Sequence, residues 1–540
     1  MELRRFETPG ISHYAYLLVD GGEAAIIDPR RDVEEYLDAA RSMGVRLRYI
    51  IETHRHEDFV MGSAHLRELT GAQVVNGKHD CFGHGDLRLD DGDEVQLGDL
   101  KIVGLHTPGH TPESMCWAVY TGDGDQAWGV FTGDTLFFGD TGRSDLPDEA
   151  RSVENAARIY DSVHEKLLPL GDGTLVFPAH GPGSVCGSGM AERASSTIGL
   201  EREYNDVFQL DRDAFAEKKG GERLPRPPYF RHMEEVNLGG GLPPASGASA
   251  ATPLDPAAFR ERASGGMIID TREPEGFAAA HIPDARSVWM GGLPIFGGWV
   301  ASEDDDIYLC TDGDDDVSTA CAHLNRIGID AIRGWVAGGF PSWRSSGERM
   351  RRAGVITPRE LKESSGLQVL DVREPDEFAS GHIPGAINVY VGHLEEKLEE
   401  LSFDRKAPVV VTCGVGHRAG VGVSILLRAG FEDVRNLLGG MKRWHALEYE
   451  TREGDAPRSV RSHTRRKTRR TPPGPARPCA PGGFVARHRR RGCRGRPRAC
   501  RAPRRDAPAA PSHRRTRATR RRAGPRRRPR TRRTRRGPPR

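Results

Sequence analysis

The chain has 540 residues, and its small formal net charge of +3 conceals two parts of opposite charge. Residues 458–540 contain 33 Lys and Arg residues against one acidic residue, whereas the remainder contains 46 basic and 75 acidic residues. This length excludes a single small domain and predicts roughly three or four units, an acidic body followed by a polycationic tail.

The cysteines and the apolar segments also exclude classes of protein. Nine cysteines without regular spacing do not form the framework of a disulfide-rich protein. The N-terminal sequence lacks an apolar core ahead of a cleavage site, and no run of about 18 apolar residues predicts a membrane span. We therefore expect no membrane association and a reducing, cytoplasmic location.

Residues 1–240 are expected to form the first domain, and they carry four motifs that place His or Asp at strand ends. The first motif, THRHEDF at residues 53–59, follows an apolar strand at 47–51 and has the pattern HxHxD. Three more follow in order: TPGH at 107–110, TGDTLF at 132–137 and FPAHG at 177–181. Imidazoles and carboxylates at strand ends can converge on one cation, so these motifs predict a metal site.

This series resembles the metallo-β-lactamase superfamily, whose fold is an αββα sandwich. The pattern of that family, HxHxDH followed by His, Asp and His, has one departure here, because Phe59 replaces a histidine of the second metal site. The remaining positions are His54, His56, Asp58, His110, Asp134 and His180. A benzyl group cannot bind a metal, so the intact first set consists of His54, His110 and Asp134.

Two histidines and one carboxylate suit non-haem Fe(II) and oxygen chemistry. The sequence around these motifs also resembles the persulfide dioxygenase branch of the superfamily. In that branch His54, His110 and Asp134 correspond to the residues that bind iron, so we expect one Fe(II) per chain. His56, Asp58 and His180 are then residues that orient the ligands, or a possible second metal site. Arg143 is a candidate for binding a substrate anion. The alternative is a zinc-dependent thioester hydrolase of the glyoxalase II type, in which a metal-bound hydroxide attacks a carbonyl.

An internal repeat follows a Gly-, Pro- and Ala-rich segment at 239–251, which is expected to be a flexible linker. Residues 269–285 match residues 370–386, and both copies later carry GGxxxW, at an offset of 101 residues. The repeat predicts two parallel-sheet domains, at 252–347 and 355–450. Its pattern closely resembles the rhodanese family, which implies two doubly wound α/β domains.

The two repeats differ in the loop where rhodaneses carry their catalytic cysteine. In the second repeat, Cys413 ends a strand and precedes small residues, a helix start and Arg418, an environment that stabilises a thiolate. The family's catalytic roles carry over to Cys413 and Arg418. In the first repeat, either Cys310 or Thr311 aligns with Cys413, and the loop holds four aspartates and no basic residue. We therefore expect a degenerate domain there.

The complete order resembles the fused persulfide dioxygenase–rhodanese proteins of sulfide detoxification. The resemblance implies oxidation of a low-molecular-weight persulfide by O2 to sulfite, and transfer of sulfane sulfur between persulfide and sulfite or thiosulfate at Cys413. We also expect a homo-oligomer. The alternative metal is zinc, with a thioester hydrolase fused to the sulfurtransferase. A third hypothesis is a non-catalytic sulfur carrier or a nucleic-acid-binding adaptor.

The tail, residues 451–540, is rich in Arg, Pro, Ala and Gly and is expected to be disordered. It is expected to bind nucleic acid only non-specifically through its charge. The alternative is that the tail has no selected function and arises from out-of-frame translation of a GC-rich coding region. The abrupt charge reversal and the scarcity of aromatic residues favour this alternative. We predict that a chain ending near Asp455 keeps its metal and unchanged turnover in both reactions. A large loss of either activity that persists at high salt would contradict this.

Overall fold

The computed structural model describes residues 1–122, 124–187 and 189–454, and the prediction of a disordered tail lies outside them apart from residues 451–454. All described residues belong to one unit, Met1–His463. Within this range no helix combines the length and the apolar character that a bilayer crossing requires.

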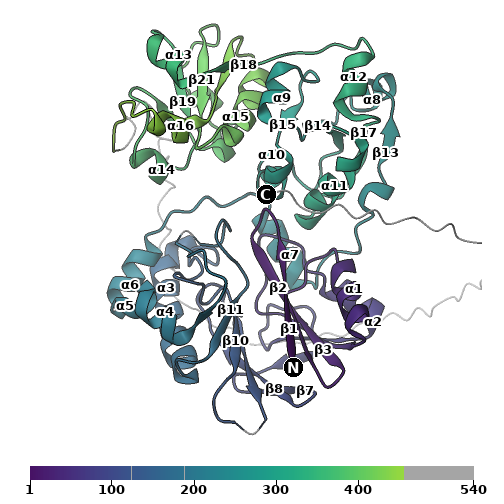
Figure 1. Ribbon diagram of the computed structural model, residues 1–540, viewed down its shortest axis with the longest axis vertical. Coiled ribbons are helices and arrows are strands. Elements are labelled where there is room, and N and C mark those ends of the chain that lie inside the picture. The colour runs from purple at the N-terminus through teal and green to yellow at the C-terminus, as the bar shows by residue number, and fades with distance from the viewer. Residues whose placement is uncertain (123, 188, 455–540) are drawn as a thin grey trace, which may run out of the picture. The chain divides into compact units, whose positions relative to one another are not determined.

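The first domain contains two six-stranded sheets (Figure 1). In the first sheet the strands lie in chain order, with two antiparallel pairings followed by parallel ones. These strands are β1 (Glu2–Thr8), β2 (His13–Asp20), β3 (Glu23–Ile27), β4 (Arg46–Ile51), β5 (Gln73–Gly77) and β6 (Leu87–Leu89). The second sheet has the order β12-β11-β10-β9-β8-β7. Its strands are β7 (Glu94–Leu97), β8 (Leu100–His106), β9 (Met115–Thr121), β10 (Gly129–Gly133), β11 (Leu175–Pro178) and β12 (Ser196–Thr197).

Strand β2 shows why the two sheets pack face to face. Alternate side chains of a strand point to opposite faces. Tyr16 and Leu18 accordingly join a core that also contains Trp117 and Phe131 of the second sheet. The intervening Leu17 belongs to a separate core on the outer face of the first sheet. Because both faces of β2 are covered, its sequence is apolar at nearly every position.

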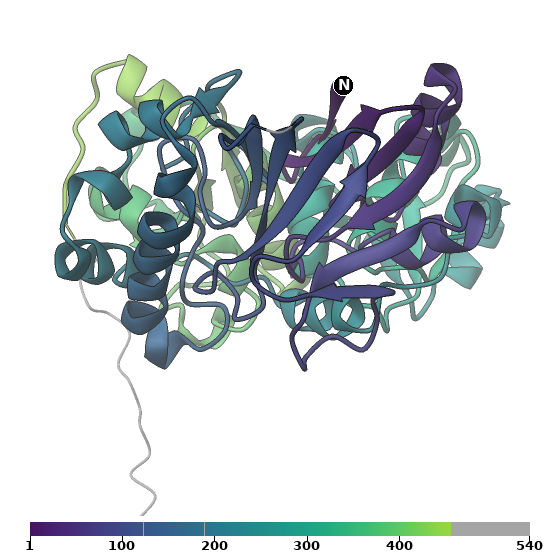
Figure 2. The same ribbon diagram turned by 90° about the horizontal axis from the view of Figure 1, so that it is seen from below.

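Helices cover the outer face of each sheet (Figures 1 and 2). The first sheet is covered by α1 (Glu34–Met43) and α2 (Ser63–Thr70). The second is covered by α3 (Ser152–Ser162), α4 (Ile198–Tyr204), α5 (Asp206–Gln209) and α6 (Arg212–Gly220). Helix α7 (Phe230–Leu238) closes this part of the chain. The αββα sandwich that the family resemblance implied is therefore confirmed.

The predicted repeat forms two five-stranded parallel sheets with the same strand order, β13-β17-β16-β14-β15 and β18-β22-β21-β19-β20. The first consists of β13 (Thr252–Leu254), β14 (Met267–Asp270), β15 (Arg286–Ser287), β16 (Ile307–Cys310) and β17 (Ile332–Val336). The second consists of β18 (Gly354–Ile356), β19 (Gln368–Asp371), β20 (Ile387–Asn388), β21 (Val409–Thr412) and β22 (Val434–Leu437).

Helices lie on both faces of each parallel sheet, as a doubly wound fold requires. The first copy has α8 (Pro256–Arg262), α9 (Pro274–Ala279), α10 (Leu293–Val300), α11 (Val317–Arg326) and α12 (Gly339–Ser345). The second has α13 (Pro358–Glu363), α14 (Pro375–Ala379), α15 (His417–Arg428) and α16 (Gly440–Ala446). The first helix of each copy begins with proline after a capping side chain, Asp255 or Thr357, which accepts backbone N–H groups.

The segment at 239–251 differs from the flexible linker that its composition predicted. Arg31 donates from Nε to the carbonyl oxygen of Pro243 at 2.9 Å, and its Nη1 donates to Asp330 at 2.7 Å. Leu242 and Ala248 pack against a hydrophobic core. A buried guanidinium holds this segment in place, a contact from a distant part of the chain that composition does not reveal.

Candidate metal centre and sulfur-transfer site

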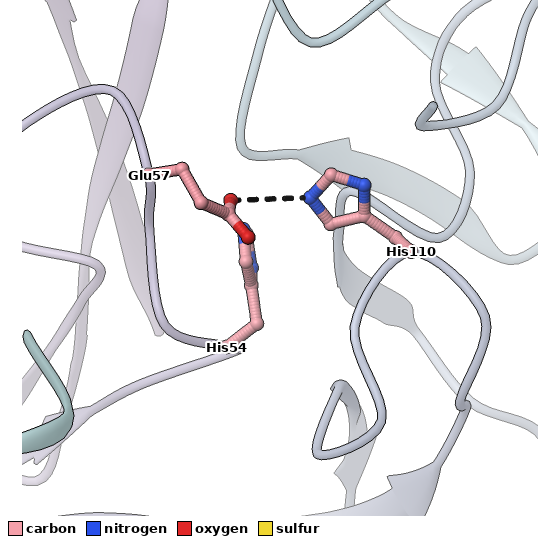
Figure 3. A group of neighbouring side chains, drawn as sticks. All are labelled: His54, Glu57 and His110. Atoms are coloured by element: carbon pink, nitrogen blue, oxygen red, sulfur yellow. Dashed lines mark ion pairs between the residues drawn. The ribbon is translucent and has the colours of Figure 1, made fainter. Parts of the chain in front are cut away.

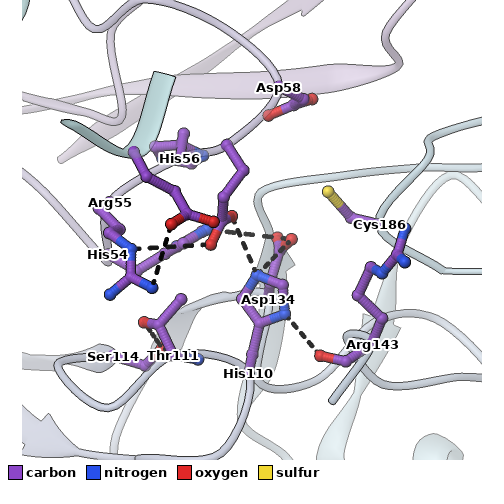
Figure 4. Close-up of polar contacts among 12 residues, drawn as sticks. His54, Arg55, His56, Asp58, His110, Thr111, Ser114, Asp134, Arg143 and Cys186 are labelled. Atoms are coloured by element: carbon purple, nitrogen blue, oxygen red, sulfur yellow. Dashed lines mark hydrogen bonds and ion pairs between the residues drawn. The ribbon is translucent and has the colours of Figure 1, made fainter. Parts of the chain in front are cut away.

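The predicted metal-ligating residues meet where strand ends of the two sheets lie together (Figure 4). His54 follows β4 and His110 follows β8. Asp134 comes directly after β10, and His180 follows β11. Each strand fixes the backbone up to its last residue, and the loop that follows turns the side chain toward a common point.

The atoms of the proposed first metal set converge without hydrogen-bond partners. The Oδ2 atom of Asp134 lies 3.5 Å from Nε2 of His110 and 3.9 Å from Nε2 of His54. All three atoms are buried and have no hydrogen-bond partner. Unpaired buried polar atoms are costly, and ligands with bonds of about 2.1 Å to one ion lie roughly 3–4 Å apart. These residues therefore fit a metal ion.

Neighbouring groups fix the orientation of both histidines. The Nδ1 atom of His110 lies 2.8 Å from the carbonyl oxygen of Arg143 and donates to it, which leaves the Nε2 lone pair free. The Nδ1 atom of His54 lies 2.9 Å from the hydroxyl of Thr53. Gly142 is necessary here, because a Cβ atom at this position would clash with the Asp134 carbonyl and approach the His110 ring.

His180 links two carboxylates, so it orients Asp134. Its Nδ1 lies 2.7 Å from Oδ1 of Asp134, and its Nε2 lies 3.0 Å from Oδ2 of Asp58. Burial alone lowers the His180 pKa, but the two carboxylates outweigh it and raise that pKa well above its usual value. Burial opposes ionisation of Asp134, but the histidines, His180 first, hold its pKa well below the usual range.

The second predicted group is also brought together, with Phe59 beside it. One ligand atom from each of His56, Asp58 and His180 lies within 4.8 Å of the others. The ring of Phe59 is fully buried, and its centroid lies 4.5 Å from that of His56. This group permits a second cation but offers only three ligands from these residues, because Phe59 fills the fourth position with an apolar ring.

Arg143 is placed differently from the prediction that it binds a substrate anion. Its side chain is buried, and its Nε and Nη2 atoms each donate to Asp145 at 2.7 Å. The other N–H groups donate to the carbonyl oxygens of Val185, Leu224 and Pro225. All five donors of the guanidinium are therefore used within the protein, and the residue acts as a structural support for His110.

Two further side chains at the site escaped sequence reasoning. Glu57 is the variable residue within HxHxD, and one of its carboxylate oxygens lies within 4.8 Å of ligand atoms of His54 and His110. The Sγ atom of Cys186 lies within 4.8 Å of ligand atoms of Asp134 and His180, and burial raises the pKa of this thiol well above its usual value. The acidic residue type within the motif was the only feature of the sequence that pointed to Glu57. Nothing in the sequence indicated Cys186.

In the second repeat, Cys413 lies between β21 and α15. Its Sγ accepts a hydrogen bond from the backbone N–H of Gly416 at 3.1 Å. Gly416 has φ of 118°, which favours glycine and aims this N–H at the sulfur. Arg418 does not point freely at the thiol, because it forms a two-point ion pair with Glu377 at 2.6 and 2.8 Å.

In the first repeat, a threonine occupies the position of the catalytic cysteine. Asp270 pairs with Cys310 across the sheet, whereas the matching Asp371 pairs with Thr412. The backbone N–H of Phe340 bonds the carbonyl of Thr311, as that of Met441 bonds Cys413. Of the two alignments that the sequence left open, the structure selects Thr311. Cys310 is buried one residue earlier, where burial and then Asp270 raise its pKa well above normal.

Comparisons with known proteins agree with this arrangement. Residues 8–180 match the model of the metallo-beta-lactamase superfamily, and residues 255–346 and 357–447 each match the rhodanese-like domain. The chain is 31% identical over 248 residues to the mitochondrial persulfide dioxygenase ETHE1 of Homo sapiens, which covers 44% of this chain and 89% of that protein. The chain belongs to the metallo-beta-lactamase superfamily. Two rhodanese-like domains follow the family's domain, as the sequence predicted.

Other members of the superfamily match over different lengths. A hydroxyacylglutathione hydrolase of Anaeromyxobacter dehalogenans is 35% identical over 172 residues, 32% of this chain and 62% of that protein. The crystal structure of a metallo-beta-lactamase from Staphylococcus aureus subsp. aureus COL matches with a TM-score of 0.56 and 26% identity. The match covers 63% of this chain and 99% of the Staphylococcus aureus protein, so the likeness extends beyond the first domain. The fold and its cluster of candidate ligands support a metal cofactor.

Proposed function

We propose that the first domain is a non-haem Fe(II) dioxygenase that oxidises a low-molecular-weight persulfide to sulfite. The observation that carries this proposal is the convergence of three unpartnered ligand atoms, from His54, His110 and Asp134. The similarity to a persulfide dioxygenase supports the same class of reaction. Two histidines and one carboxylate leave positions for exogenous ligands, and Fe(II) held this way supplies the activation of O2.

The reaction balances with one molecule of water. A persulfide RSSH, O2 and H2O give the thiol RSH, sulfite and two protons, and the outer sulfur loses four electrons to O2. The protein's part is to hold the three ligands in place. The carbonyl of Arg143 fixes His110, and His180 fixes Asp134.

We propose that Cys413 transfers sulfane sulfur. Its thiolate would attack the outer sulfur of a persulfide, breaking the S–S bond, releasing the thiol and leaving a persulfide on the enzyme. Sulfite would then attack that outer sulfur, which forms thiosulfate and restores the thiolate; the reverse direction uses the same steps. The N–H of Gly416 and the start of α15 support the negative charge at the sulfur.

A cavity of about 510 Å³ lies beside Arg418, and neither a proposed metal ligand nor Cys413 lines it. It is lined by Arg418 and Tyr390 of the last domain and by Ser184 and Pro225 of the first. Joining both domains in one chain keeps the product of the first reaction at a high effective concentration near the second site. Sulfite from the first reaction is the acceptor that the second requires.

The second candidate is a zinc-dependent thioester hydrolase, favoured by the group of His56, Asp58 and His180 and by the likeness to a hydroxyacylglutathione hydrolase. Elemental analysis of the full chain together with a thioester assay separates the two functions. The dioxygenase proposal expects one iron per chain and no thioester hydrolysis. Two zinc ions per chain with rapid thioester hydrolysis would contradict it. A non-catalytic sulfur carrier would hold persulfide at Cys413 without consuming O2.

A further inference from the structure

Glu57 is a buried carboxylate that makes no hydrogen bond. Its side chain is fully buried, and neither of its oxygens has a hydrogen-bond partner. Among the described residues it is the only carboxylate with both oxygens in this condition. Figure 3 shows the carboxylate turned toward the ring of His110, with Oε2 lying 3.6 Å from Nε2 of His110.

Other buried carboxylates near the site do have partners. Glu113 accepts from Nη1 of Arg55 at 3.0 Å. Glu52 pairs with His84 at 2.8 Å and accepts from Asn76 at 3.1 Å. Nε of Arg55 approaches Oε1 of Glu57 only to 3.9 Å, and Nη1 of the same guanidinium is paired with Glu113. A buried carboxylate that makes no hydrogen bond is unfavourable even beside its two ion-pair neighbours, Arg55 and His110, so this position favours a further cation.

The Glu57 carboxylate lies close to the proposed metal ligands. Oε2 of Glu57 and Oδ2 of Asp134 both approach Nε2 of His110, at 3.6 and 3.5 Å. One ligand atom each from His54, His110 and Glu57 lies within 4.8 Å of the others. Carboxylate oxygens and imidazole nitrogens at these separations can share one ion.

We propose that Glu57 is a fourth protein ligand of the same ion, which completes a set of two histidines and two carboxylates. This inference rests on the proposed metal site of the first domain. The second carboxylate neutralises the remaining positive charge of a divalent ion and leaves one position fewer for persulfide and O2.

The test uses Glu57→Gln in the full chain, because glutamine keeps the shape and removes the charge. The metal-binding constant is measured by chelator competition with Fe(II) under anaerobic conditions and separately with Zn(II). We expect affinity for both ions to fall by about 10- to 100-fold, the range found when groups that support a metal site are lost. The control Glu52→Gln removes an equally buried charge nearby and should leave affinity unchanged.

Thermal melting gives a second readout that a merely structural role would not produce. Metal-free Glu57→Gln should melt no lower than metal-free wild type, because the variant lacks a buried carboxylate that makes no hydrogen bond. The rise in melting temperature on adding metal should be smaller for the variant. Equal affinity and equal metal-induced stabilisation in variant and wild type would overturn the role of Glu57 alone. Wild type that binds neither ion would overturn the proposed function and this inference together.

Discussion

Replacing Asp134 by alanine is expected to remove the metal ion and O2 consumption together. The Oδ2 atom of Asp134 is the point that both His54 and His110 approach, and the other oxygen is held by His180. Because loss of an outer partner of a metal ligand already costs about 10- to 100-fold, loss of the ligand itself should lower affinity and activity by at least about 100-fold. Metal content and O2 uptake on the same preparation measure both effects.

A matched control separates this effect from general damage. Asp86 is a carboxylate paired with Arg67 at the surface of the same domain, and Asp86→Ala should leave metal content and O2 uptake unchanged. If Asp134→Ala retained full metal, the assignment of this ligand would be wrong.

Replacing Cys413 by serine is expected to abolish sulfur transfer and to leave persulfide oxidation largely intact. An alcohol is a far weaker nucleophile than a thiolate at neutral pH, so sulfurtransferase activity should fall by roughly 1,000-fold or more. The backbone N–H of Gly416 would still find an acceptor in the serine hydroxyl, so the loop should keep its structure. Thiosulfate turnover and O2 uptake, assayed separately, measure the two activities.

The first repeat provides the control for this experiment. Cys310 is buried and lies one residue before the position of the nucleophile, where Thr311 stands. Cys310→Ser should therefore leave sulfur transfer unchanged. Residual transfer in the Cys413→Ser protein that disappears on adding Cys310→Ser would show that the first repeat is active after all.

The motifs carry the information that places a side chain where it follows directly from its strand. His54, His110 and Asp134 stand at or near strand ends, and strand ends of packed sheets fix positions within a small region. Such motifs can be read from the sequence because the spacing and the residue types within each motif do not depend on partners from distant segments. The αββα sandwich was implied by the resemblance of these motifs to a known family, and the two parallel sheets were predicted from the internal repeat.

Partners that come from distant segments were not predictable. The carbonyls that occupy Arg143 lie about 40 and 80 residues away, and Glu377, which holds Arg418, lies 41 residues away. Only strand register decided between Cys310 and Thr311. A homo-oligomer and a cytoplasmic location stay predictions, since no contact within one chain bears on them.

The most direct test of the dioxygenase proposal is O2 consumption by the full chain loaded anaerobically with Fe(II). Glutathione persulfide and coenzyme A persulfide serve as substrates, and O2 uptake, sulfite and free thiol are measured together. The proposed reaction predicts one O2 consumed and one sulfite formed for each persulfide, with the thiol released in equal amount. Iron-loaded protein that consumes no O2 with either persulfide would contradict the account.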